Sequence, residues 1–255
     1  MTKILTYNVN GIRAALRKGM GPWLAATDAD IVCFQEIKAQ ENQIDKEFFR
    51  RLGYEHQYWF PAERKGYSGT AILSKIAPRE IIKGTGIGFM DREGRNLTAV
   101  FDDFAVMSIY VPSGSSEERL QVKFRYMDAF FSYVSHLKTQ IPGLILSGDF
   151  NICHQPRDIH DPVRLRHVSG FLPEERAWLS ALMDLGFTDT FRLFDPRPHQ
   201  YTWWSYRAGS KKRNKGWRID YHLAESALEK NIRRNIILKE VNFSDHAPVL
   251  LETDI

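Results

Sequence analysis

The chain has 255 residues, of which 43% are hydrophobic and 26% charged, and its formal net charge is +4. This length and apolar content suit one α/β domain over residues 1–255 with a single large core. No apolar stretch reaches the roughly 18 residues that a membrane span requires, so we expect a soluble cytoplasmic protein that contacts no membrane. We also expect it to be a monomer. The two cysteines, Cys33 and Cys153, lack metal-type spacing to histidine and predict buried thiols, not a zinc site.

Short apolar runs, bounded by polar or turn residues, predict strands along the whole chain. These runs cover residues 3–8, 30–35, 69–74, 97–102, 105–111, 143–149, 219–224 and 248–253. Strand clusters that are separated by a few helices indicate two sheets packed together with helices outside.

Two helices have clear sequence signals. A capping-box pattern, Ser115-x-x-Glu118, predicts the start of the stronger helix. Apolar residues then recur every three or four positions, which is the period of a helix face that packs on a core. These residues are Leu120, Phe124, Met127, Phe131 and Val134. The second helix is predicted to begin near Pro173 and to end at Gly186.

The predicted strand over residues 143–149 delivers an acid and an amide to its end. Asp149 and Asn151 are two residues apart, and in extended backbone such residues point to the same side. Their carboxylate and carboxamide groups can therefore converge on one reacting atom. Taken alone, the same pattern fits an ordinary strand followed by an Asx turn.

Other predicted strands also end in polar side chains. These ends carry Asn8 with Asn10, Gln35 with Glu36, Tyr110, Asp220, and Asp245 with His246. Each alone fits a turn, a cap or a surface acid. A parallel or mixed sheet gathers such ends along one edge, where ligands bind, so we expect one polar site built from all of them.

Basic residues concentrate in two stretches beside these strand ends. The stretch 207–218 has six basic residues and no acid, with glycine and tryptophan between them. Its basic residues are Arg207, Lys211, Lys212, Arg213, Lys215 and Arg218. A flexible, solvated charge run and a nucleic-acid-binding loop both fit this composition. The second stretch, at Arg157 and residues 164–167, includes Arg166.

In their order along the chain, the polar residues resemble the exonuclease III family of abasic-site endonucleases, within the endonuclease/exonuclease/phosphatase superfamily. The resemblance extends from Lys3 to Leu251 and implies a four-layered α/β sandwich of two packed mixed sheets flanked by helices. Further matching segments are Gly66-Tyr67-Ser68-Gly69, Gly86-Ile87-Gly88, Asp91-Arg92-Glu93-Gly94-Arg95, Gly170 to Arg176, and Tyr201-Thr202-Trp203-Trp204.

The acids of the expected site favour a hard, oxygen-seeking cation. Carboxylates without clustered histidine or cysteine indicate Mg²⁺, for which Mn²⁺ can substitute, and Glu36 is the best ligand. The resemblance adds Asn8 and Asp245 as ligands. It also places Asp149 and Asn151 beside the ion.

The resemblance further implies a catalytic role for each remaining polar residue. Asp149 is expected to act as the general base for the attacking water, which Asn151 orients. His246 would polarise a phosphate oxygen, and Asp220 would fix the tautomer of His246 and favour its charged form. Tyr110 would contact the phosphate or the leaving oxygen.

The implied substrate is double-stranded DNA with abasic sites or blocked 3′ ends. The family builds a pocket for the flipped, baseless sugar where this chain has Trp203, Trp217 and Ile219. The residues expected to contact DNA outside the pocket are Lys211, Lys212, Arg213 and Arg166. Ser113 and Val168 depart from the family pattern and predict weaker incision at internal abasic sites than removal of blocked 3′ ends.

Two other readings compete with this function. A deoxyribonuclease I-like, sphingomyelinase-like or inositol-phosphatase-like member of the superfamily would share the Asp149-x-Asn151 and Asp245-His246 elements. The segments 66–69 and 91–95 favour a repair nuclease over these relatives. A nucleic-acid-binding module without catalysis would need the carboxylates lost, and they are all present.

Overall fold

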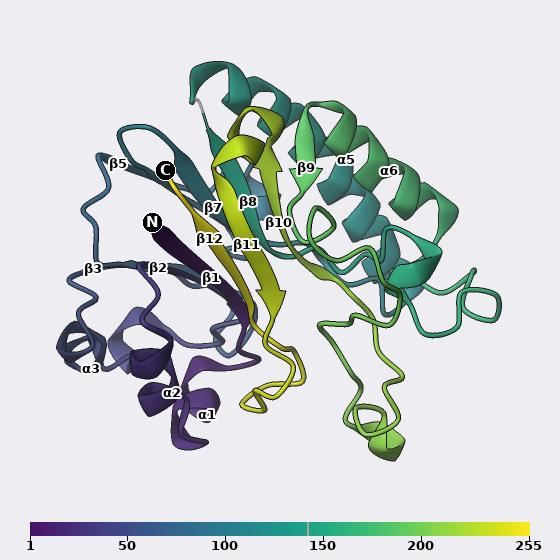
Figure 1. Ribbon diagram of the computed structural model, residues 1–255, viewed down its shortest axis with the longest axis horizontal. Coiled ribbons are helices and arrows are strands. Elements are labelled where there is room, and N and C mark those ends of the chain that lie inside the picture. Colours follow the sequence, from purple (N-terminus) through teal and green to yellow (C-terminus); the bar gives the residue numbers. More distant parts are fainter. Residues whose placement is uncertain (142) are drawn as a thin grey trace.

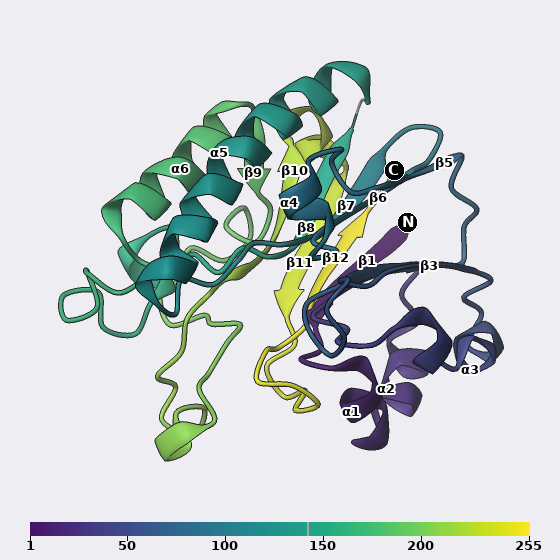
Figure 2. The ribbon, with the colours of Figure 1, turned by 180° about the vertical axis from the view of Figure 1, so that it is seen from behind.

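Because side chains alternate along a strand, each central strand packs on two different layers. In the computed structural model, which describes residues 1–141 and 143–255, two six-stranded sheets lie face to face with helices on their outer faces (Figure 1, Figure 2). Ile4 and Ile145 belong to the core between the sheets. Leu5 and Leu146, one residue further on, pack under the helices on either side. The four-layered α/β sandwich expected from the sequence is confirmed.

The first sheet contains both ends of the chain. Its strand order is β11-β12-β1-β2-β4-β3, and helices α1, α2 and α3 pack on its outer face. The strands are β11 (Ile232–Ile237), β12 (Val249–Thr253), β1 (Thr2–Asn8), β2 (Ile31–Gln35), β4 (Thr70–Ser74) and β3 (His56–Phe60), and the helices are α1 (Ile12–Arg17), α2 (Met20–Thr27) and α3 (Lys46–Arg51).

The second sheet carries the two longer helices side by side (Figure 1, Figure 2). Its strand order is β5-β6-β7-β8-β10-β9. The strands are β5 (Glu80–Lys83), β6 (Asn96–Val100), β7 (Ala105–Tyr110), β8 (Leu144–Asp149), β10 (Asp220–Glu225) and β9 (Phe187–Asp189), and the helices are α4 (Gly88–Asp91), α5 (Glu117–Gln140) and α6 (Pro173–Asp184). In the described part of the chain, no helix is both long and apolar enough to cross a membrane.

Strand register brings the polar strand ends to one place. β1 and β2 are parallel, so Asn8 lies opposite Gln35 at their carboxyl ends. β7 and β8 are also parallel, and Tyr110 lies opposite Asp149. β10 runs antiparallel to β8, which puts Asp220 opposite Asp149 as well. Because β1 packs against β8 and β2 against β7, these ends meet between the two sheets.

Every strand predicted from the sequence is present, but β3, β5, β9 and β11 were not predicted. These four are the edge strands of the two sheets. An edge strand is paired on one side only and carries more polar residues, so it lacks the apolar run that marks a central strand. β5, for example, is buried at neither end.

The predicted helices are present with two corrections. Ser116, not Ser115, caps α5, because its side chain accepts a hydrogen bond from the backbone nitrogen of Arg119. The buried stripe of α5 contains Met127 and Val134 as predicted. The remaining three residues of the predicted stripe, Leu120, Phe124 and Phe131, are only partly buried; the other fully buried side chains of α5 are Lys123, Tyr126, Phe130 and Leu137.

We predict that Gly148→Ala destabilises the second sheet next to the polar strand ends. A Cβ at residue 148 would lie 1.9 Å from the main-chain oxygen of Ile109 on β7, so the β7–β8 pair would have to separate. The expected loss is about 1–3 kcal/mol of unfolding free energy, measured by urea denaturation. Gly88→Ala is the matched control, because a Cβ there meets nothing within 4 Å. Equal stability of the two variants would contradict this prediction.

Candidate active site

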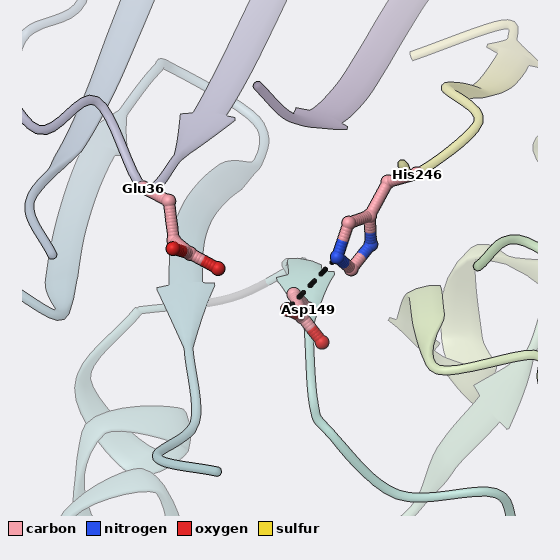
Figure 3. A group of neighbouring side chains, drawn as sticks. All are labelled: Glu36, Asp149 and His246. Atoms are coloured by element: carbon pink, nitrogen blue, oxygen red, sulfur yellow. Dashed lines mark ion pairs between the residues drawn. The ribbon is translucent and has the colours of Figure 1, made fainter. Parts of the chain in front are cut away.

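Three side chains from different strand ends converge at the centre of the site. Glu36 directly follows β2, Asp149 ends β8, and His246 precedes β12. One potential ligand atom from each lies within 4.8 Å of the others. Figure 3 shows Glu36 and His246 on either side of Asp149. The site therefore joins the two sheets.

Asp149 is held by hydrogen bonds from both sheets. Asn8 donates from Nδ2 to Asp149 Oδ2 at 2.8 Å and to Glu36 Oε1 at 2.9 Å. On the other side, the backbone nitrogen of Asn151 donates to Asp149 Oδ1 at 2.8 Å. Asn8 was predicted as a metal ligand. Its side-chain nitrogen bridges the two carboxylates, and its side-chain oxygen contacts neither of them.

His246 and Asp220 form the pair that the sequence predicted. His246 Nδ1 lies 2.9 Å from Asp220 Oδ2, and His246 Nε2 lies 3.9 Å from Asp149 Oδ2. Burial alone would lower the pKa of His246, but the charges of Asp220 and Asp149 outweigh it and raise the pKa to about 10. The imidazole is therefore protonated at neutral pH, and its Nε2–H is a donor.

The two central carboxylates differ in their protonation. Burial and the charge of Asp220 raise the pKa of Asp149 to about 7, against a partly compensating effect of His246. Burial also opposes ionisation of Glu36, but the Lys38 ammonium 2.7 Å away and the hydrogen bond from Asn8 lower its pKa. Glu36 is thus ionised at neutral pH, and Asp149 is the group whose charge is least stabilised.

Asp245 is positioned by two donors. Asn10 Nδ2 donates to Oδ1 at 2.9 Å, and Trp203 Nε1 donates to Oδ2 at 3.0 Å. Lys38 in turn donates to Asn10 Oδ1 at 2.5 Å. The sequence placed Asn10 among the polar strand ends without a specific role, and it did not point to Lys38. The signal available for Asn10 was its spacing of two from Asn8, the same spacing as in Asp149-x-Asn151.

Tyr110 faces the same centre from β7 and is largely buried. Burial and the charge of Glu36 raise its pKa, so the phenol is neutral and can donate. The Arg95 guanidinium lies 4.5 Å from the Tyr110 ring centre, and its Nη1 donates to the Tyr110 carbonyl at 2.9 Å. Glu93 pairs with Arg95 at 2.6 Å. The segment 91–95 therefore supports Tyr110.

A pocket of about 560 Å³ opens onto these groups. Trp203 and Trp217 meet edge to face at 6.0 Å between ring centres, and Ile219 lies beside them. The structure thus brings the three predicted pocket residues together with the catalytic candidates. The full lining is Glu36, Tyr110, Ser113, Gly114, Ser115, Asp149, Asn151, Val168, Ser169, Gly170, Trp203, Trp217, Ile219, Asp245 and His246.

The basic stretch is not one solvated loop. Arg218, which the sequence grouped with it, is buried and pairs with Asp158 at 2.7 Å and Asp189 at 2.6 Å. Arg218 lies two residues before β10, where two acids from distant segments, Asp158 and Asp189 at the end of β9, balance its charge. Lys211 is half-buried and donates to the Val241 carbonyl at 2.9 Å.

The other predicted DNA-contacting residues lie on the surface. Lys212 and Arg213 are exposed on the segment that follows Lys211, and Arg166 is exposed on the loop that leads to Val168. None of them lines the pocket. Their placement therefore separates a cationic outer surface from the polar and aromatic interior of the site.

The donor set fits a hard divalent cation. Glu36, Asp149 and Asp245 offer carboxylate oxygens in one pocket, whereas the Asn8 amide oxygen accepts a hydrogen bond from the backbone nitrogen of Asn10 at 3.0 Å. His246 shares the cluster, but its Nδ1 is bound to Asp220, and the charges of Asp220 and Asp149 raise its pKa and so favour the protonated ring over a metal ligand. Oxygen ligands alone suit Mg²⁺ or Mn²⁺ and do not favour zinc.

Comparison with known proteins agrees with this geometry. Residues 5–246 match the endonuclease/exonuclease/phosphatase family. The chain is 40% identical to an exodeoxyribonuclease of Bacillus subtilis over 256 residues, which cover 99% of this chain and 100% of that protein. It is 38% identical over 252 residues to a DNA repair nuclease of Danio rerio, with 98% and 81% of the two chains covered.

Solved structures show the same fold. An AP endonuclease from Archaeoglobus fulgidus superposes with a TM-score of 0.90 at 30% identity, and each chain is covered completely. A 3′ phosphatase from Neisseria bound to a product DNA hairpin superposes with a TM-score of 0.92 at 29% identity, again over 100% of both chains. The chain therefore belongs to the endonuclease/exonuclease/phosphatase family and, within it, to the exonuclease III group of repair nucleases.

Proposed function

We propose that this protein is a Mg²⁺-dependent DNA repair nuclease that acts as a cytoplasmic monomer. It hydrolyses the phosphodiester bond 5′ to abasic sites, processes blocked 3′ ends, or does both. One observation carries the proposal: a buried carboxylate, Asp149, lies between an acid cluster and a protonated His246–Asp220 pair at the floor of an aromatic pocket. The similar proteins named as repair nucleases and as a 3′ phosphatase support both activities.

Residues of the first sheet would hold the cation. Glu36 would be its main ligand and Asp245, which lines the same pocket, a second one, while Asn8 would support the site by holding the Glu36 and Asp149 carboxylates. When bound, Mg²⁺ supplies positive charge for the phosphate oxygens and for the leaving oxygen. Lys38 and Asn10 keep Glu36 and Asp245 in place, so loss of either would weaken the metal site indirectly.

Residues of the second sheet would carry out the proton transfers. Asp149 takes a proton from water, and the water oxygen then bonds to phosphorus as the P–O3′ bond breaks. Asn151 orients this water: its amide nitrogen donates to the Val111 carbonyl at 2.9 Å, so its oxygen is the atom that accepts from water. His246 donates from Nε2 to a phosphate oxygen, and the Tyr110 hydroxyl gives a proton or hydrogen bond to the leaving O3′.

The pocket beside these groups would select the lesion. Trp203, Trp217 and Ile219 form an apolar wall that suits a sugar without its base. Lys212, Arg213 and Arg166 would bind the flanking phosphates without regard to sequence. Lys211 would act mainly by anchoring its loop, because its ammonium is already bound to the Val241 carbonyl and Asn242 Oδ1.

The direct test uses matched duplexes that contain an internal abasic analogue, a 3′-phosphate at a nick, or no lesion. With Mg²⁺ present, the wild type should process at least one lesion much faster than intact DNA. Asp149→Asn should lower kcat by roughly 10²- to 10⁴-fold while DNA affinity, measured by fluorescence anisotropy, is retained. Wild-type inactivity on both lesions, or full activity of Asp149→Asn, would refute the proposed function.

The pocket makes a separate prediction about discrimination. Trp217→Ala widens the wall without removing a ligand contact, so kcat/KM on intact duplex should rise relative to kcat/KM on the abasic duplex. Trp203 is a less clean choice, because its Nε1 also binds Asp245. Tyr206→Ala is the control, since that ring is 67% exposed and does not line the pocket. A loss by the same factor on both substrates in Trp217→Ala would assign Trp217 to general DNA binding.

A further inference from the structure

A fully buried ion pair lies next to Asn151, in the segment that follows β8. Lys123 of α5 and Glu175 of α6 are both 0% exposed, and Lys123 Nζ lies 2.6 Å from Glu175 Oε1. Neither residue lines the pocket, and neither takes part in the mechanism above. The pair joins the two helices that lie side by side on the second sheet (Figure 2).

Lys123 also holds the backbone of Asn151. Its ammonium donates to the Asn151 carbonyl at 2.8 Å. Asn151 has a φ of 51°, a left-handed conformation that costs most residues about 1 kcal/mol or more. The bond to Lys123 fixes the peptide that follows this residue. It therefore stabilises the conformation in which Asn151 binds both Asp149 and the Val111 carbonyl.

Glu175 holds the neighbouring loop of the pocket wall. Its Oε2 accepts from the backbone nitrogens of Gly170 at 2.5 Å and Leu172 at 3.0 Å, and its Oε1 accepts from Ser169 Oγ at 2.9 Å. Ser169 and Gly170 line the pocket. The Gly170 carbonyl then accepts from the Cys153 backbone nitrogen at 2.7 Å, which ties this loop back to the segment after Asn151.

Stability alone does not account for the pair. Desolvation of a buried ion pair offsets most of its Coulombic attraction, and neutral replacements of similar volume are often equally stable. We propose that Lys123 and Glu175 are positioning residues: together they set the distance between Asn151 and the Ser169–Leu172 loop, and hence where water and phosphate sit against Asp149. This inference rests on the proposed nuclease function and extends it to residues behind the site.

The test is the double variant Lys123→Met with Glu175→Gln, which removes both charges at nearly constant volume and leaves an acceptor for the loop. We expect its unfolding midpoint to remain close to wild type, while kcat falls roughly 10- to 100-fold with little change in KM, because a displacement of about 1 Å has an effect of this size. In the NMR spectrum of the double variant, the side-chain amide resonance of Asn151 should shift from its wild-type position. The variant Asn151→Ser identifies that resonance, because it removes the amide.

The matched control is Lys138→Met. Lys138 lies on the same helix and donates to the Leu185 carbonyl of the α6 end at 2.6 Å, so it makes the same kind of bond away from the site. Its kcat and the Asn151 resonance should stay at wild-type values. A double variant with wild-type kcat and an unshifted Asn151 resonance would overturn the inference, as would equal losses in Lys138→Met.

If the double variant does not fold, Lys123→Met alone is measured in the same way. Glu175 then keeps its three donors from Ser169, Gly170 and Leu172, which offset part of the cost of leaving its buried charge without the Lys123 ammonium. Failure of the proposed function can be told apart from failure of this inference, because the shift of the Asn151 resonance is measured independently of nuclease activity. A shift without wild-type nuclease activity would keep the positioning role and reject the reaction, whereas no shift in the folded single variant would reject the positioning role.

Discussion

Carboxylate groups are concentrated between the two sheets, where burial and mutual repulsion both oppose their ionisation. Glu36, Asp149, Asp220 and Asp245 meet between the sheets, and Asp149 and Asp220 are almost completely buried. Burial and the neighbouring charge of Asp220 raise the pKa of Asp149 to about 7, and the charges of Asp220 and Asp149 raise the pKa of His246 to about 10. In the proposed mechanism a divalent cation, held by Glu36 and Asp245, would supply further positive charge to these carboxylates.

The architecture supplies this arrangement by repeating one pattern in each sheet. The order β11-β12-β1-β2-β4-β3 is matched by β9-β10-β8-β7-β6-β5, with a central parallel pair in both. β1 therefore corresponds to β8, and their final residues, Asn8 and Asp149, are hydrogen-bonded across the interface at 2.8 Å. In the proposed mechanism, the groups that would hold the cation come mainly from one sheet, and the groups that would transfer protons come mainly from the other.

The central strands and the polar residues at their ends could be predicted from the sequence, because both depend on local patterns. Asp149, Asn151 and the Asp245–His246 pair follow apolar runs, and their order along the chain resembles one family. The Trp203 and Trp217 wall was predicted by that resemblance alone. The structure places all of these residues around one pocket.

What the sequence did not predict depends on contacts between distant segments. Arg218 belongs to a basic run in the sequence, yet acids from two other segments draw it into the core. Lys123 is one of many lysines, and only the packing of α5 on α6 shows that it reaches the Asn151 carbonyl. The edge strands were missed for a different reason, since half-solvated strands have no continuous apolar signal.

The most direct test compares the unfolding midpoints of wild type and Asp149→Asn from about pH 4 to pH 8. Each protein is measured once in chelator and once with Mg²⁺. A folded pKa raised from 3.8 to about 7 means that wild type loses stability relative to Asp149→Asn as pH rises through this range. Mg²⁺ should restore that stability to wild type and have a smaller effect on the variant. A difference between the two proteins that changes with neither pH nor Mg²⁺ would contradict the claim that carboxylate repulsion, relieved by a cation, organises the site.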